Sequence, residues 1–310
     1  MAKGELLETL IPGAFTESPP PRARRMPRRR GMPDVRSHAG ELRTLPAANH
    51  DSDLLDIRDA QISFRELLLA PSSLQTFAEV HLEYRREDLL AGHGMAPRRT
   101  MLFVGPPGTG KSAAAEAFAD ETGRDFALVN LATVVSSFLG DTARNLAAIF
   151  AVASERPLVL LFDEFDAIAK ERAEASDHGE LKRVVTAFLQ LLERFQGPSI
   201  LIAATNHPDL LDLAVWRRFD IVMPFAEPKV HEIRALLRRK LDPLPRQRGL
   251  DIERVASACK GLSQAEVTRV VSDAYRRHLL HAQPERLIGT EELLAAAQAV
   301  STRQSIGRGG

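Results

Sequence analysis

The sequence predicts an α/β protein in which helices cover both sides of a parallel five-stranded sheet, followed by a small all-α domain. Three observations carry this prediction. Short apolar segments of strand length alternate with longer segments of helical periodicity, which is typical of parallel sheets. After Pro228 the strand-like segments stop and only helical periodicity remains. Before residue 53 neither pattern is present, so the chain is expected to begin with a tail.

The five expected strands are short, apolar and bounded by turn residues. They lie within RRTMLFVG, DFALVN, LVLLFDE, SILIAATN and DIVMPF. The helical pattern is clearest over 180–195, where Leu181, Val184, Phe188 and Leu192 recur at spacings of three or four. This spacing places them on one face of a helix, which would pack against the sheet.

Composition divides the chain into four parts. Residues 1–52 contain a proline- and arginine-rich stretch that cannot bury enough apolar surface to offset its ordering entropy, so we expect a disordered tail. Residues 53–226 would form the sheet domain and 227–303 the helical domain, with a second disordered tail over 304–310.

The first tail carries two features that allow more than one interpretation. Six arginines between residues 22 and 30 could form a solvated arm or an electrostatic handle for an acidic partner. A short apolar cluster could dock as a helix into a partner's groove. Its members are Leu6, Leu7, Leu10, Ile11 and Phe15.

Composition also weighs against several classes of protein. The formal net charge is zero, which argues against a protein that mainly wraps nucleic acid. The single cysteine, Cys259, allows no internal disulfide and is expected in the core. No apolar run approaches the ~18–20 residues that a membrane helix needs, and the first residues do not resemble a signal peptide. We therefore expect a cytoplasmic protein without a membrane partner.

The segment GPPGTGKS has the spacing of a phosphate-binding loop between a strand and a helix. Its glycines let backbone N–H groups wrap phosphates, and the following helix adds its positive dipole end. Lys111 should reach the β- and γ-phosphates, and Ser112 should hold Mg²⁺. The expected nucleotide-binding residues are Gly105, Pro106, Pro107, Gly108, Thr109, Gly110, Lys111, Ser112 and Ala113.

Acidic and amide residues follow two of the other strands. Asp163 suits the Mg²⁺ shell, while Glu164, pointing elsewhere because side chains alternate on a strand, can take the proton from an attacking water. Asp166 is assigned no chemistry, because it could cap the next helix. Asn206 could orient the water and donate to the γ-phosphate, although an asparagine in a turn is the plainer interpretation.

Two adjacent arginines, Arg217 and Arg218, precede the last expected strand. Paired arginines usually form a solvated face. Here they stand beside Trp216 and Phe219, near the end of the sheet, and guanidinium groups suit the phosphate charge that develops in the transition state.

With these motifs in this order, residues 55–303 resemble an AAA+ ATPase of the AAA clade. The resemblance implies a P-loop NTPase fold with a helical lid, Mg²⁺ and ATP as ligands, and a ring oligomer, expected to be a hexamer. It implies that Asn206 is the first sensor and that Arg217 and Arg218 are arginine fingers. Ala265 stands where other clades place a sensor arginine, so Arg269 is not given that role.

The resemblance also interprets the segment SSFLGDTARN. In family members that thread polypeptides, an aromatic–hydrophobic–glycine loop faces a central pore, and Phe138, Leu139 and Gly140 match that pattern. Core packing is the alternative for Phe138 and Leu139. The loop ERAEASDHGELKR resembles a second pore loop. The amino-acid sequences of several segments further resemble those of bacterial AAA ATPases often encoded beside subtilisin-like proteases. This resemblance makes such a protease a candidate partner.

The sequence therefore predicts an ATPase that couples hydrolysis to remodelling, unfolding or disassembly of a protein client. One alternative is a nucleotide-gated switch that docks on a partner such as a protease without threading it. A third hypothesis is a nucleic-acid motor that uses the arginine-rich tail, but the zero net charge of the chain disfavours it.

Overall fold

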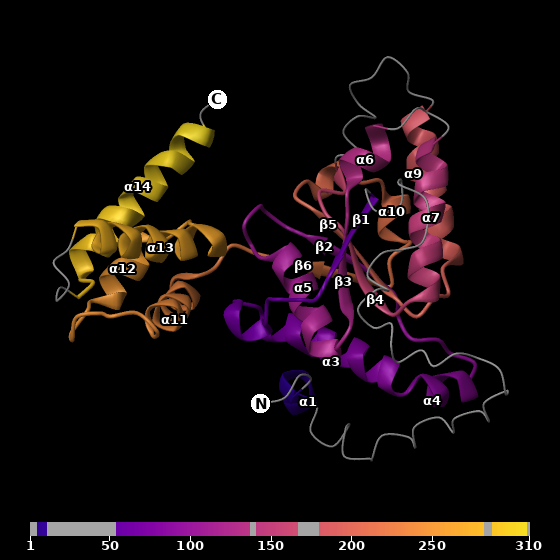
Figure 1. Cartoon of the computed structure of the whole chain (residues 1–310), viewed down its shortest axis with the longest axis horizontal. Coiled ribbons are helices and arrows are strands. Elements are labelled where there is room, and N and C mark those ends of the chain that lie inside the picture. Colours follow the sequence, from indigo (N-terminus) through magenta and orange to yellow (C-terminus); the bar gives the residue numbers. More distant parts are fainter. Residues whose placement is uncertain (1–4, 11–53, 137–140, 167–179, 282–286, 309–310) are drawn as a thin grey trace, which may run out of the picture.

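The computed structural model describes residues 5–10, 54–136, 141–166, 180–281 and 287–308 (Figure 1). Within these ranges the chain forms a sheet domain and a helical lid, which Figure 1 shows beside one another. None of the helices in these ranges is long and apolar enough to cross a membrane.

The sheet has six strands in the order β1-β3-β4-β5-β2-β6. They are β1 (Leu55–Arg58), β2 (Thr100–Val104), β3 (Asp125–Val129), β4 (Leu158–Phe162), β5 (Ile200–Thr205) and β6 (Ile221–Pro224). The five expected strands are present and parallel, but β1 adds a sixth that pairs antiparallel with β3. The sequence missed β1 because a four-residue edge strand that alternates half-buried and exposed residues has no continuous apolar run.

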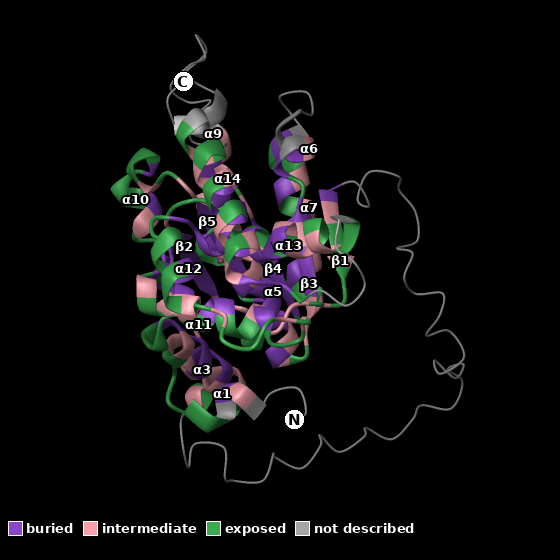
Figure 2. Cartoon of the chain, turned by 90° about the vertical axis from the view of Figure 1, so that its left-hand side faces the viewer, coloured by how far each residue is buried: buried purple, intermediate pink, exposed green. Residues whose placement is uncertain are grey.

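Alternate residues of β2 enter separate cores on the two sides of the sheet. Met101 and Phe103 pack with residues of α3 (Pro71–Arg85) and α5 (Lys111–Thr122). Leu102 packs in the other core, with residues of α7 (Asp141–Glu155) and α9 (Glu180–Arg194). Figure 2 shows the buried residues on the strands between these helices. Shorter elements are α4 (Glu87–Gly92), α6 (Leu131–Ser136), α10 (Leu213–Trp216) and 3₁₀ turns at Phe64–Glu66 and Pro208–Leu210.

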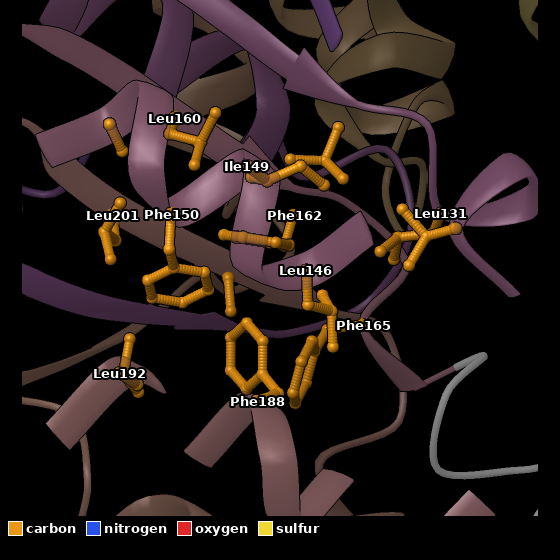
Figure 3. Packing of buried hydrophobic residues seen from close by; sticks show 14 of the residues in the cluster. Leu131, Leu146, Ile149, Phe150, Leu160, Phe162, Phe165, Phe188, Leu192 and Leu201 are labelled. Carbon is orange, nitrogen blue, oxygen red and sulfur yellow. The ribbon is translucent and has the colours of Figure 1, made fainter. Parts of the chain in front are cut away.

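A cluster of phenylalanines holds the carboxyl end of β4 (Figure 3). The ring of Phe188, on α9, lies 5.0 Å from Phe162 in a T-shaped contact, 4.8 Å from Phe165 and 5.8 Å from Phe150. Aromatic pairs with this geometry add to the stabilisation from burial alone. The cluster therefore fixes the turn after β4, which carries Asp163 and Glu164.

The lid consists of α11 (Val230–Leu241), α12 (Ile252–Ala258), α13 (Gln264–His281) and α14 (Thr290–Arg308). It has its own apolar core, which includes Cys259, and burial raises the pKa of that thiol to about 11. Cys259 is therefore a core residue, as expected. Helix α14 continues to Arg308, whereas the sequence placed a disordered tail from residue 304.

Helix α1 (Glu5–Leu10) packs on the sheet domain although it lies within the expected tail. Leu7 is fully buried in the core beside α3 and α5. The carboxylate of Glu121, on α5, accepts hydrogen bonds from the N–H of Leu6 at 2.7 Å and of Leu7 at 2.9 Å. These leucines thus bind this chain's own domain, whereas the sequence allowed a partner's groove. The rest of the tail, with Ile11 and Phe15, lies outside the described residues.

Candidate functional site

The phosphate-binding loop lies between β2 and α5, as the sequence predicts. Gly105 has φ +149°, and a Cβ there would lie 1.9 Å from the carbonyl oxygen of Phe225. The loop therefore requires glycine at this position to pass beneath the end of β6. Gly110, at φ +97°, turns the chain into the first residue of α5.

Lys111 is buried and joins this loop to the end of β5. Its Nζ donates to the carbonyls of Gly105 at 2.7 Å and Pro106 at 2.8 Å, and to Oδ1 of Asn206 at 2.7 Å. Burial lowers the pKa of Lys111, and the carboxylates of Asp163 and Asp166 act in the opposite direction. The structure thus brings Lys111 and Asn206 together.

Ser112 and Asp163 also lie in contact. The hydroxyl of Ser112 donates to Oδ2 of Asp163 at 2.5 Å. A hydroxyl beside a carboxylate offers the hard oxygen ligands that Mg²⁺ prefers, and a phosphate would complete the shell. The pair therefore fits the metal that the sequence assigned to these two residues.

Glu164 is held in a strained turn just past the end of β4. Its φ is +50°, a left-handed conformation that few residues other than glycine adopt. The N–H of Glu164 donates to Oδ1 of Asp163 at 2.9 Å, and the N–H of Phe165 donates to Ala204 on β5 at 2.8 Å. Strand β4 ends at Phe162, so neither Asp163 nor Glu164 lies on it, and it is the turn that separates their carboxylates. The sequence argument, which relied on alternation of side chains along a strand, was therefore wrong. The Glu164 carboxylate is exposed to the cavity described below.

Asp166 belongs to the site, although the sequence assigned it no chemistry. It is 4% exposed, and its Oδ1 accepts from the hydroxyl of Thr205 at 3.0 Å and from the N–H of Asn206 at 3.2 Å. It therefore ties the turn after β4 to the residue at the end of β5. The sequence carries only a weak signal for this role. A carboxylate in an apolar segment needs buried hydrogen-bond partners, and Thr205 and Asn206 lie at the end of the neighbouring strand, where they could serve as such partners.

These residues surround one cavity of about 600 Å³. From the expected site it is lined by Pro107, Gly108, Gly110, Lys111, Ser112, Ala113, Asp163, Glu164 and Asn206. Gly105, Pro106 and Thr109 do not line it. They support the loop instead, through the Lys111 contacts and a 2.8 Å hydrogen bond from the Thr109 hydroxyl to Pro106.

The remaining walls come from segments that the sequence did not assign to the site. They are Ile62, Glu66 and Leu67 from the segment before α3, and Lys240, Gln264, Ala265 and Thr268 from the lid. No short motif marks these positions, because the fold brings them to the loop from both sides. Arg269 does not line this cavity but a second pocket, to which Pro106, Pro107 and Gly108 of the loop also belong.

Arg217 and Arg218 are exposed beyond α10 and do not line the cavity of their own chain. Arg218 forms an ion pair with Glu193 on α9. Arg217 has no ion pair with any residue that the structure describes. The expected pore residues Phe138, Leu139 and Gly140 lie outside the described residues, between α6 and α7, as does most of the second loop.

Comparison with known proteins gives one consistent result. A model of the family described as "ATPase family associated with various cellular activities (AAA)" matches residues 101–227. The uncharacterized AAA family ATPase y4kL of Sinorhizobium fredii is 36% identical over 236 residues, which cover 76% of this chain and 71% of that protein. The proteasome-activating nucleotidase of Methanothermobacter thermautotrophicus is 32% identical over 202 residues. These residues cover 63% of this chain and 49% of the nucleotidase.

The fold is also that of a solved AAA domain. The crystal structure of the FIGL-1 AAA domain in complex with ADP superposes with a TM-score of 0.66, covering 83% of this chain and 92% of that one. The sequences are 22% identical, so this likeness concerns the fold alone.

Proposed function

This chain belongs to the AAA family of ATPases, and on that premise we propose that its ATP hydrolysis drives remodelling of a protein client by a ring of identical subunits, a hexamer. The phosphate-binding loop, the Ser112–Asp163 pair, Glu164 and the Lys111–Asn206 pair meet in one cavity that the lid helps to enclose. This arrangement supports hydrolysis that is coupled to movement of the lid.

Each residue of the cavity has a role in this proposal. Lys111 leaves its carbonyl partners to bind the β- and γ-phosphates, and Asn206 orients the attacking water. Glu164 accepts the proton of that water, because its side chain is exposed to the cavity in which the water would lie. Mg²⁺, held by Ser112 and Asp163, would neutralise phosphate charge.

The observation that carries the ring is the position of the two arginines. They lie outside their own cavity and are exposed, although the rest of the expected catalytic set lies within it. A neighbouring subunit could bring them to a nucleotide, where an arginine supplied in trans can be worth ~10³-fold or more in rate. Arg217 would carry more of this effect, because Arg218 is engaged by Glu193.

A mixing experiment tests the shared site. Lys111→Ala removes the phosphate contact but keeps the arginines, whereas the double variant Arg217→Ala/Arg218→Ala keeps the cavity. Each alone should hydrolyse ATP at least ~100-fold more slowly than the wild type. An equal mixture should regain up to about one quarter of wild-type activity, because half of the sites are intact and half of those face intact arginines.

The matched control is Arg276→Ala/Arg277→Ala, which removes an exposed arginine pair of the lid. It should retain wild-type activity. If mixing restored no activity although the two variants assembled together, the shared site would be refuted.

The proposal further assigns Phe138, Leu139 and Gly140 to client contact in the central pore. Phe138→Ala should then leave ATP hydrolysis intact and abolish client remodelling, whereas Phe138→Tyr should retain both. A Phe138→Ala ring that still remodels its client would instead favour a switch that docks on a partner without threading it. A subtilisin-like protease is the first partner to test, on the sequence resemblance noted above.

A further inference from the structure

Two side chains of the lid form hydrogen bonds with one peptide group of the segment before α3. They contact the peptide group between Leu67 and Leu68 from opposite sides. Arg239, on α11, donates to the carbonyl of Leu67 at 2.6 Å, and Oε1 of Gln264, on α13, accepts from the N–H of Leu68. Leu67 lines the cavity, and Leu68 packs against the core of the lid. One wall of the nucleotide cavity is therefore fixed by the lid.

Gln264 makes a second contact, with the phosphate-binding loop. Its Nε2 donates to the carbonyl of Thr109 at 3.2 Å. The approach is close, because a Cβ added to Gly110 would lie 2.5 Å from this nitrogen. The next residue, Ala265, donates its N–H to Gly108 at 3.0 Å. The lid thus meets the loop through both a side chain and its backbone.

The chemistry of this joint requires a carboxamide. Gln264 is 7% exposed and uses its oxygen as an acceptor and its nitrogen as a donor at the same time. A carboxylate of the same shape would keep the acceptor but present negative charge to the Thr109 carbonyl. An aliphatic side chain would leave both backbone groups unpaired in a buried place, which is costly.

We propose that Gln264 is a positioning residue for ATP turnover. Its carboxamide forms hydrogen bonds that hold the lid to the Leu67–Leu68 peptide and to the phosphate-binding loop, and these bonds set how long nucleotide is retained. Opening the lid must break these bonds, and ADP leaves when it opens. The inference concerns nucleotide retention by one subunit, so it stands whether or not the chain forms a ring.

The test compares Gln264→Leu with the wild type in ADP dissociation, followed with a fluorescent ADP analogue, and in steady-state hydrolysis. Loss of the two hydrogen bonds should speed dissociation and raise the KM for ATP by about tenfold or more. The kcat should not fall by more than about twofold, because Lys111, Glu164 and Asn206 are unchanged. Gln298→Leu, at an exposed glutamine of α14, is the matched control and should alter neither.

A second variant, Gln264→Glu, gives a signature that a structural role would not produce. When protonated, a carboxylic acid supplies both a donor and an acceptor. Burial and Glu66 raise the pKa of such a group at position 264, whereas Arg239, Lys240 and Lys111 lower it, and we expect burial to dominate. ADP affinity of Gln264→Glu should therefore approach that of the wild type near pH 5.5 and fall by about tenfold toward pH 8. Neither the wild type nor Gln298→Glu should show this loss.

Two results would overturn the inference. One is a folded Gln264→Leu protein whose ADP dissociation rate and KM stay within about twofold of the wild type. The other, decisive even if Gln264→Leu does not fold, is an ADP affinity of Gln264→Glu that depends on pH no more than that of Gln298→Glu.

Discussion

At the residue scale, Glu164 and Asp166 have opposite environments although they are only two positions apart. Glu164 is exposed to the cavity in a left-handed turn, free to meet a water. Asp166 is buried and accepts hydrogen bonds from Thr205 and Asn206. The strained turn directs one carboxylate outward and the other inward, so the proposed mechanism gives Glu164 the attacking water and Asp166 the placement of Asn206.

Replacing Asp166 should therefore affect catalysis more than binding. Asp166→Ala leaves the hydroxyl of Thr205 and the N–H of Asn206 without their acceptor, so Asn206 shifts from the position in which it orients water. Since small misplacements are costly in catalysis, we expect kcat to fall by about 10- to 100-fold with KM for ATP changed little. Steady-state kinetics check this.

The matched variant is Thr205→Val, which keeps the Asn206 bond but removes the hydroxyl that donates to Asp166 and accepts from the N–H of His207. It should lower kcat less than Asp166→Ala does. A wild-type kcat for a folded Asp166→Ala protein would contradict the positioning role.

Individual site residues differ in how far the sequence could identify them. Lys111, Ser112 and Asp163 stand in contiguous motifs whose chemistry is local, and the structure brings them together. Asp166 and Gln264 act through partners that are 39 and 155 residues away in the chain. Their roles depend on burial and on closure of the lid, which no local pattern encodes.

At the element scale, the elements that the sequence missed or placed differently lie at the edges of the molecule. β1 is a short edge strand, and α1 owes its position to the burial of Leu7 and to the carboxylate of Glu121. By contrast, the central strands and α9 were predictable, because continuous apolar runs and regular spacing report burial directly. Elements held by a few long-range contacts leave little trace in composition.

Helix α3 offers a test of stability, since it buries His81. The side chain is 7% exposed, and burial lowers its pKa from 6.5 to about 4, with further lowering by Arg85 and Arg124. Between these two values only the unfolded chain binds the proton. The free energy of unfolding should therefore rise with pH from about 4 to about 6.5 and lose this dependence above 6.5.

His81 should contribute up to about 3 kcal/mol to the total change in unfolding free energy over this pH range, from the size of the shift. His81→Leu should flatten the dependence over this range, whereas His231→Gln, at an exposed histidine of α11, should not. Denaturant unfolding at several pH values measures it. An unchanged slope in His81→Leu would show that His81 is not the group that titrates.

At the scale of the whole molecule, the chain's own lid helps to enclose the cavity, yet none of the described residues that line it is an arginine. The lid contributes Gln264 and Ala265, while Arg217 and Arg218 stand exposed elsewhere on the surface. On the proposed function, this separate surface would complete the site of a neighbouring subunit. Hydrolysis would then depend on ring assembly.

The most direct test of this account is the mass in solution of Glu164→Gln with Mg²⁺ and ATP, measured by light scattering. The substitution should keep nucleotide binding, block hydrolysis and so retain the assembled state. The account predicts a hexamer. A monomer at all concentrations, with ATP shown to be bound, would contradict it, because no neighbour would then bring an arginine to the site.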